Sequence, residues 1–206
     1  MYRHGIEAIK YFPEQPLPYA LSGIALMMQK QFAEALPLFE KGVELTDDKP
    51  ELRSQFYSYL ADCYYNLDSV ERAFKMFDEV LKINPNDILV LNNYAYYLSV
   101  ERRDLDKAEE MSYKTVKAEP NNATYLDTYA WILFEKGNYA EARIYIDNAM
   151  KSDEEKSDVV VEHCGDIYFM TGDVEGALKY WKKALEMGSE SKTLKEKIEK
   201  KKYIAE

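Results

Sequence analysis

Four residues between positions 162 and 166 are of the types that carry out chemistry in proteins. They are Glu162, His163, Cys164 and Asp166, in the stretch VVVEHCGDIYF. A cysteine beside a histidine can act as a thiolate nucleophile with its base, and histidine, cysteine and carboxylates are ligands of zinc. The alternative is that a helical framework needs these residues for packing.

The spacing argues against both kinds of chemistry. Adjacent residues on a helix point about 100° apart, so His163 and Cys164 cannot readily form the hydrogen bond that the nucleophile needs. We expect Cys164 and Cys63 to be buried small hydrophobes. The chain has two histidines, no paired-cysteine or His-x3-His spacing and no glycine-rich phosphate loop. The sequence therefore predicts no enzyme, no catalytic residue, no metal and no cofactor.

Composition restricts the class of protein further. The chain has 206 residues, 47% hydrophobic and 31% charged, which predicts a folded protein outside the membrane. No apolar run approaches the roughly 20 residues of a membrane-spanning helix. The net charge of -10 argues against nucleic-acid binding and favours basic or polar partners. The first residues lack a signal-peptide pattern, and a cytoplasmic and an envelope location both stay open.

Small residues recur along the chain with a fixed period. One series opens amphipathic helical stripes, and its members are Ala35, Ala73, Ala108, Ala142 and Ala177. A second series lies upstream of the first, at Gly23, Ala61, Ala95, Ala130 and Gly165. Both series repeat every 34 to 38 residues. Such a period indicates an array of helix–turn–helix units.

The finer pattern resembles the tetratricopeptide repeat. Its first helix carries two large residues, a small one and an aromatic, as in Tyr57…Leu60-Ala61…Tyr64. On the resemblance, Cys164 and Gly165 are the large–small pair of the fifth unit. The resemblance implies an all-α fold, a right-handed α-α superhelix that forms a solenoid of helix–turn–helix repeats.

Alignment of the small residues divides the chain into repeats. The expected segments are a trailing helix of an upstream repeat (1–15), five repeats (16–53, 54–87, 88–122, 123–157 and 158–189) and a capping helix (190–206). The incomplete first segment predicts that the natural protein extends further upstream. We expect the six lysines of KTLKEKIEKKK to form a solvated face of the cap.

In this family the first helices line a concave groove that holds peptides or partner segments. The resemblance places eleven residues in it: Ser58, Asp62, Tyr65, Asn92, Tyr96, Asp127, Trp131, Phe134, Glu162, Asp166 and Phe169. Glu162 and Asp166, four residues apart, are expected to point into the groove, with His163 at its edge. The alternative for Trp131 and Phe169 is packing against the neighbouring repeat.

The groove predicts a non-catalytic module that binds a protein or peptide. Aromatic side chains supply contact area and carboxylates accept hydrogen bonds from basic groups, so the partner is expected to be basic or polar. The clamps that hold chaperone C-termini use cations, whereas these positions carry Asp62, Asp127 and Asp166. The alternative function is structural self-association into a homo-oligomer, through the N-terminal or the convex face.

Overall fold

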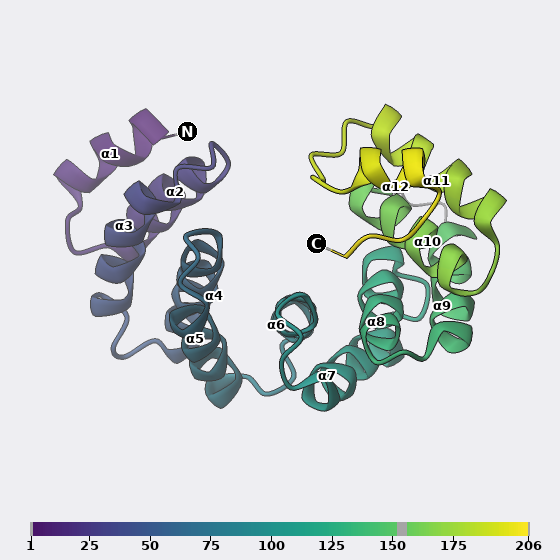
Figure 1. Ribbon diagram of the computed structural model, residues 1–206. Coiled ribbons are helices and arrows are strands. Elements are labelled where there is room, and N and C mark those ends of the chain that lie inside the picture. Colours follow the sequence, from purple (N-terminus) through teal and green to yellow (C-terminus); the bar gives the residue numbers. More distant parts are fainter. Residues whose placement is uncertain (1, 152–155, 206) are drawn as a thin grey trace. The chain divides into compact units, whose positions relative to one another are not determined.

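The computed structural model of the chain describes residues 2–151 and 156–205, and the regular structure of that part is helical (Figure 1). Its twelve helices are α1 (Tyr2–Tyr11), α2 (Pro16–Met27), α3 (Phe32–Glu44), α4 (Pro50–Asn66), α5 (Val70–Ile83), α6 (Ile88–Val100), α7 (Leu105–Ala118), α8 (Ala123–Glu135), α9 (Tyr139–Lys151), α10 (Asp158–Met170), α11 (Val174–Glu186) and α12 (Leu194–Lys200). The described residues contain no strand, which confirms the predicted all-α class.

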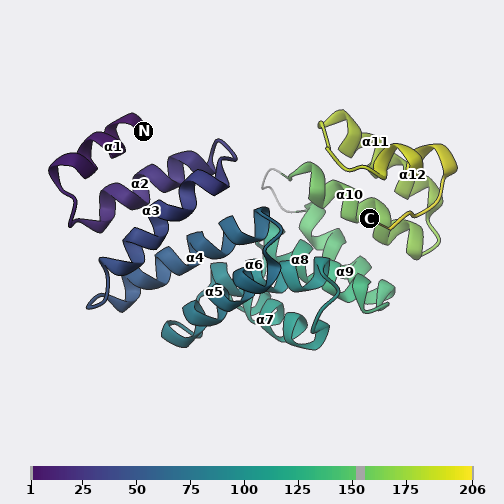
Figure 2. The ribbon, with the colours of Figure 1, turned by 60° about the vertical axis from the view of Figure 1, so that its left-hand side comes forward.

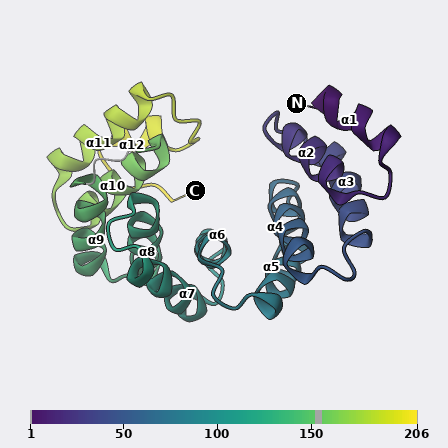
Figure 3. The same ribbon diagram turned by 180° about the vertical axis from the view of Figure 1, so that it is seen from behind.

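The chain divides into two compact units, Met1–Val90 and Leu91–Glu206, and the division falls inside α6. In unit 1, α2 packs on α3 and α4 packs on α5; in unit 2, α8 packs on α9 and α10 on α11. Within each unit a pair also contacts the next one, through α3 and α4 or through α9 and α10. Figures 2 and 3 show these stacked pairs from two further sides. The fold is therefore a solenoid of helical repeats, as predicted.

Local sequence explains where the helices of unit 2 begin and end. The Asn122 side chain accepts hydrogen bonds from the amides of Thr124 and Tyr125 at the start of α8, and the Asp173 side chain accepts from the Gly176 amide at the start of α11. These are N-caps that satisfy amides left without a helical partner. Gly172 has φ +87° just after α10, in the left-handed region that glycine adopts without strain. These local interactions define the starts of α8 and α11 and the end of α10.

The expected repeat boundaries stay a prediction, and they can be placed on the helices. Helices α2, α6, α8 and α10 begin at the first residues of the expected repeats. Helix α4 instead begins at Pro50, so the expected boundary at residue 54 lies within it. Residues 152–155, inside the expected fourth repeat, lie outside the described residues.

The two series of small residues face the core. The alanines of the downstream series are all 0% exposed, and large side chains press against glycines of the upstream series. A Cβ atom on Gly165 would overlap the Trp181 ring, and one on Gly23 would overlap the Phe39 ring. These positions are small because a neighbouring ring fills the space that a side chain would need.

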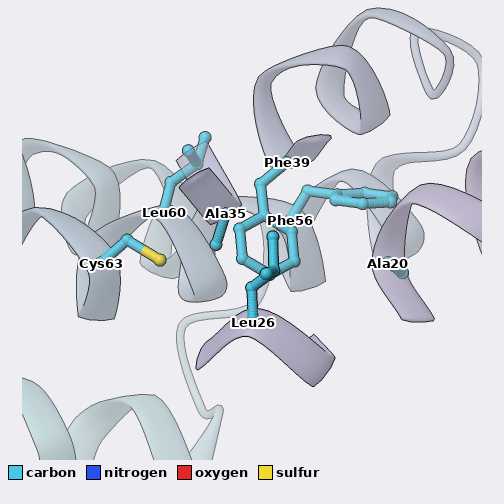
Figure 4. Close-up of a cluster of buried hydrophobic side chains, with 7 residues drawn as sticks. All are labelled: Ala20, Leu26, Ala35, Phe39, Phe56, Leu60 and Cys63. Carbon is cyan, nitrogen blue, oxygen red and sulfur yellow. The ribbon is translucent and has the colours of Figure 1, made fainter. Parts of the chain in front are cut away.

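In unit 1, the same principle builds a core of aromatic and aliphatic side chains (Figure 4). Phe39 and Phe56 are both 0% exposed, and their ring centroids lie 6.3 Å apart. Phe56 also presses on Gly42, where a Cβ would overlap its ring. The core contains Cys63, buried as expected and without a disulfide.

Candidate interaction site

The predicted groove residues fall into two sets. Ser58, Asp62 and Tyr65 lie half-buried on α4 of unit 1. The other eight lie in unit 2: Asn92 and Tyr96 on α6, Asp127, Trp131 and Phe134 on α8, and Glu162, Asp166 and Phe169 on α10. We use "first-helix face" for the side of unit 2 formed by α6, α8 and α10.

The C-terminal helix brings a lysine against the two carboxylates of α10. Lys197 Nζ on α12 lies 2.9 Å from Glu162 Oε1 and 2.8 Å from Asp166 Oδ2. All three residues are buried, with Lys197 and Asp166 each 2% exposed. The expectation that Glu162 and Asp166 point into an open groove is therefore wrong, because a cation from the same chain covers them.

Both carboxylates also accept hydrogen bonds from neutral side chains. Ser191 Oγ donates to Glu162 Oε1 at 2.8 Å and Ser189 Oγ donates to Oε2 at 3.1 Å. Trp181 Nε1 donates to Asp166 Oδ1 at 2.8 Å. Burial nevertheless raises the pKa of Asp166 to about 6, although Lys197 favours its ionised form. A buried charge is tolerated when it is both paired and hydrogen-bonded, as here.

The lysine-rich cap was only partly predicted. Five of its six lysines are exposed, as expected of a solvated face, and Lys197 is the exception. Helix α12 packs against α11 and directs Lys197 toward α10. One lysine of the run, Lys197, thus lies in the interior of unit 2.

A second buried pair joins α8 to α10. His163 Nδ1 lies 3.1 Å from both carboxylate oxygens of Asp127, and the exposed fractions of the two residues are 7% and 5%. His163 therefore lies inside the packing between helices, not at the edge of a groove as expected. Burial opposes its charged form, but attraction by Asp127, Asp166 and Glu162 outweighs burial and raises the pKa of His163.

His163 and Lys197 occupy equivalent places in the repeat pattern, one period apart. They are 34 residues apart in the sequence. Their carboxylate partners, Asp127 for His163 and Glu162 for Lys197, are 35 residues apart. Helix α12 thus takes the place that the first helix of another repeat would take. Counting one more period from His163 along the sequence would have found Lys197.

The raised pKa of His163 predicts a pH-dependent stability. Its folded pKa lies above the unfolded value of about 6.5, so its stabilising contribution is complete below that pH and is lost as pH rises through the folded pKa. The groups around it are Asp127 on α8, Glu162 and Asp166 on α10, and Lys197 on α12.

We expect the urea midpoint of unit 2 to fall as the pH rises above about 6.5, the unfolded pKa of histidine, and through the raised folded pKa of His163. Tryptophan fluorescence is a suitable probe, because both tryptophans of the chain lie in this unit. The fall should be smaller in a His163→Gln variant. An equal fall in the variant and the wild type would contradict the assignment to His163.

Aromatic rings continue from His163 along α8. The Trp131 ring stacks on His163 with centroids 4.0 Å apart and on Phe134 with centroids 4.7 Å apart. Tyr203, beyond α12, meets Phe134 edge-on at 5.3 Å. Phe134 is only 4% exposed and Trp131 is half-buried. On α10, Phe169 stacks on Trp181 at 5.8 Å, which is the packing alternative considered for it.

The described residues offer little to a catalytic reaction. They contain no group of three histidine, cysteine or carboxylate residues placed to hold a metal. Burial raises the pKa of both thiols, that of Cys63 to about 12, so neither is a thiolate at neutral pH. In the part of the chain that was searched, no helix is both long and apolar enough to span a bilayer.

Hollows in unit 2 are shallow. One, of about 610 Å³, lies beside the turn between α8 and α9 and is lined by residues 137–141 with Met170 and Thr171. None of the predicted groove residues lines it.

Comparison with protein-family models agrees with the fold of helical repeats. Tetratricopeptide repeat models match residues 26–92, 76–110 and 123–156. The chain belongs to the tetratricopeptide repeat family. A search of curated proteins finds no match to this tetratricopeptide repeat protein.

Solved structures with the same fold include several proteins of low sequence identity. TTC0263, a thermophilic tetratricopeptide repeat protein of Thermus thermophilus, is 16% identical with a TM-score of 0.71, and the match covers 91% of this chain and 98% of that one. YrrB, described as having an unusual peptide-binding site, is 18% identical with a TM-score of 0.63, covering 95% and 97%.

A match to the Cut9–Hcn1 hetero-tetramer of the APC/C has a TM-score of 0.84 at 13% identity, and covers 97% of this chain but 38% of that one. These likenesses establish the fold. The family and the fold support a role as a protein-interaction scaffold.

Proposed function

We propose that this tetratricopeptide repeat protein is a non-catalytic interaction module whose first-helix face in unit 2 binds a segment of another protein. The observation that carries the proposal is the position of its own C-terminal residues. A polypeptide segment already lies on this face, with the Tyr203 ring edge-on against Phe134 at 5.3 Å. The face is thus suited to chain segments that offer an aromatic side chain.

The internal pairing of charges changes the partner that we expect. Asp127, Glu162 and Asp166 suggested a basic ligand, but His163 and Lys197 already neutralise them. A partner cation would have to displace a buried, hydrogen-bonded lysine, which is unfavourable. Aromatic contact by Trp131 and its neighbours is therefore the better source of affinity, since large rings dominate binding energy at interfaces.

A displayed library of twelve-residue peptides tests this function. Peptides selected on the purified protein should bind at least about 10-fold more weakly to a Trp131→Ala variant, because removal of an interface aromatic typically costs more than about 1 kcal/mol. The matched control is Tyr113→Ala, an aromatic 47% exposed on the second helix α7. Circular dichroism would verify that both variants remain helical.

Two results would contradict the proposal. One is selected peptides that bind the Trp131 variant as tightly as the wild type, and the other is the absence of any selected peptide. Sedimentation velocity on the same samples tests the alternative function, self-association. A stable homo-oligomer without peptide binding would favour that alternative.

A further inference from the structure

The five residues after α12 (Lys201–Ala205), here called the C-terminal tail, return toward α8 (Figure 1). Lys201, the C-cap of α12, has φ +50°, a left-handed conformation that is unfavourable for lysine. The Lys202 amide then donates to the Lys197 carbonyl at 3.2 Å. Within the described residues this is the last backbone hydrogen bond of the chain. Beyond it, side chains hold the tail.

Tyr203 is the residue that attaches the tail. Its ring lies edge-on against Phe134, and Lys197 Nζ lies 5.4 Å from the ring centroid. Arg102, which pairs with Glu135 at 2.8 Å, interacts with the Tyr203 hydroxyl. Burial, with nearby Asp166 and Glu135, raises the pKa of this hydroxyl. A single aromatic side chain thus meets a ring and two cations.

Next to Phe134 lies a hydrogen-bond donor that has no acceptor in the described part of the chain. Trp131 stacks directly on Phe134, and its Nε1 atom is buried without a hydrogen-bond partner among the described residues. A buried donor without an acceptor is unfavourable and uncommon in folded proteins. A carbonyl oxygen from a bound segment would satisfy it, and the tail does not.

We propose that the C-terminal tail is a displaceable occupant of a docking surface formed by Phe134, Trp131 and Arg102, and that the partner segment inserts an aromatic side chain in place of Tyr203. This inference rests on the proposed function and names the chemistry of the partner. Helix α12 stays in place because buried Lys197 holds it. The tail exchanges without α12, because its aromatic and cation contacts are those of one side chain, Tyr203.

The competition has a measurable consequence. A partner binds only the fraction of molecules whose tail is released, so its apparent affinity is lowered by that fraction. If the tail is released in about a tenth of the molecules, removing its anchor tightens binding about 10-fold. Tyr203→Phe keeps the ring and should preserve the competition. Ile204→Ala, a change in the neighbouring tail residue, is the matched control.

The experiment selects peptides from the displayed library on full-length Tyr203→Ala protein. Their affinities are then measured for the wild type, Tyr203→Ala, Tyr203→Phe and Ile204→Ala. We expect selected peptides to carry an aromatic residue and to bind Tyr203→Ala at least about 10-fold more tightly than the other three. In amide NMR spectra of the wild type, peptide addition should move the 203–205 signals to random-coil positions, and the Trp131 indole signal should shift.

The outcomes separate this inference from the proposed function. Equal affinities for the wild type and Tyr203→Ala, with unchanged tail signals, would overturn the inference and leave the function standing. Failure to select any peptide on either protein would overturn both. Release of the tail on raising the protein concentration, without peptide, would show that a second copy supplies the aromatic group and would also overturn the inference.

Discussion

A Lys197→Met variant is expected to lose about 3–5 kcal/mol of the free energy of unfolding of unit 2 at about pH 7.5, the usual effect of removing one partner from a buried ion pair. Methionine fills a similar volume, but it leaves Glu162 and Asp166 buried without their ion-pair partner. The measurement is urea unfolding followed by tryptophan fluorescence, which reports on unit 2 alone.

The same variant should recover stability in acid. Without the lysine, which favours the ionised form, burial alone acts on Asp166 and raises its pKa. A group whose folded pKa is raised contributes stability at low pH that disappears as pH rises through that pKa. The loss should therefore be smaller at about pH 5 than at about pH 7.5. Lys200→Met is the matched control, because Lys200 is exposed and pairs only with Glu196 at the surface, and we expect an unchanged midpoint. Equal midpoints for the two variants would refute the buried role of Lys197.

A Phe56→Ala variant is expected to destabilise unit 1 by about 3–5 kcal/mol, as large-to-small changes of buried phenylalanine do. The ring is 0% exposed and contacts Phe39 (Figure 4). It also fills the space over Gly42. Its removal leaves a cavity that alanine cannot close. Amide hydrogen exchange of peptides from residues 2–90, followed by mass spectrometry, measures the effect where it arises.

The matched control for this change is Phe12→Ala in the same unit. Phe12 is 60% exposed, so its replacement should alter exchange little. Similar protection losses in the two variants would show that Phe56 does not carry the core. Faster exchange in Phe56→Ala alone supports the packing described here.

Most of the fold could be predicted because the repeat is a local pattern. The periodic alanines, such as Ala142 and Ala177, open helices whose neighbours in sequence are also neighbours in space. Gly165 and Cys164 were correctly predicted to be packing residues, since each helix pair needs a small position for the ring opposite. The expectation for Lys197 was wrong because a lysine run ordinarily faces solvent.

The sequence by itself determined the family, the helical period and the positions that must be small. Those features repeat within about 35 residues and follow from the space between adjacent helices. Only the tertiary structure decided that Glu162 and Asp166 meet Lys197 and that Tyr203 lies on Phe134. The physical reason is that a carboxylate on a first helix suits both open solvent and a buried pair. Which of the two occurs depends on whether another part of the chain brings a cation to it.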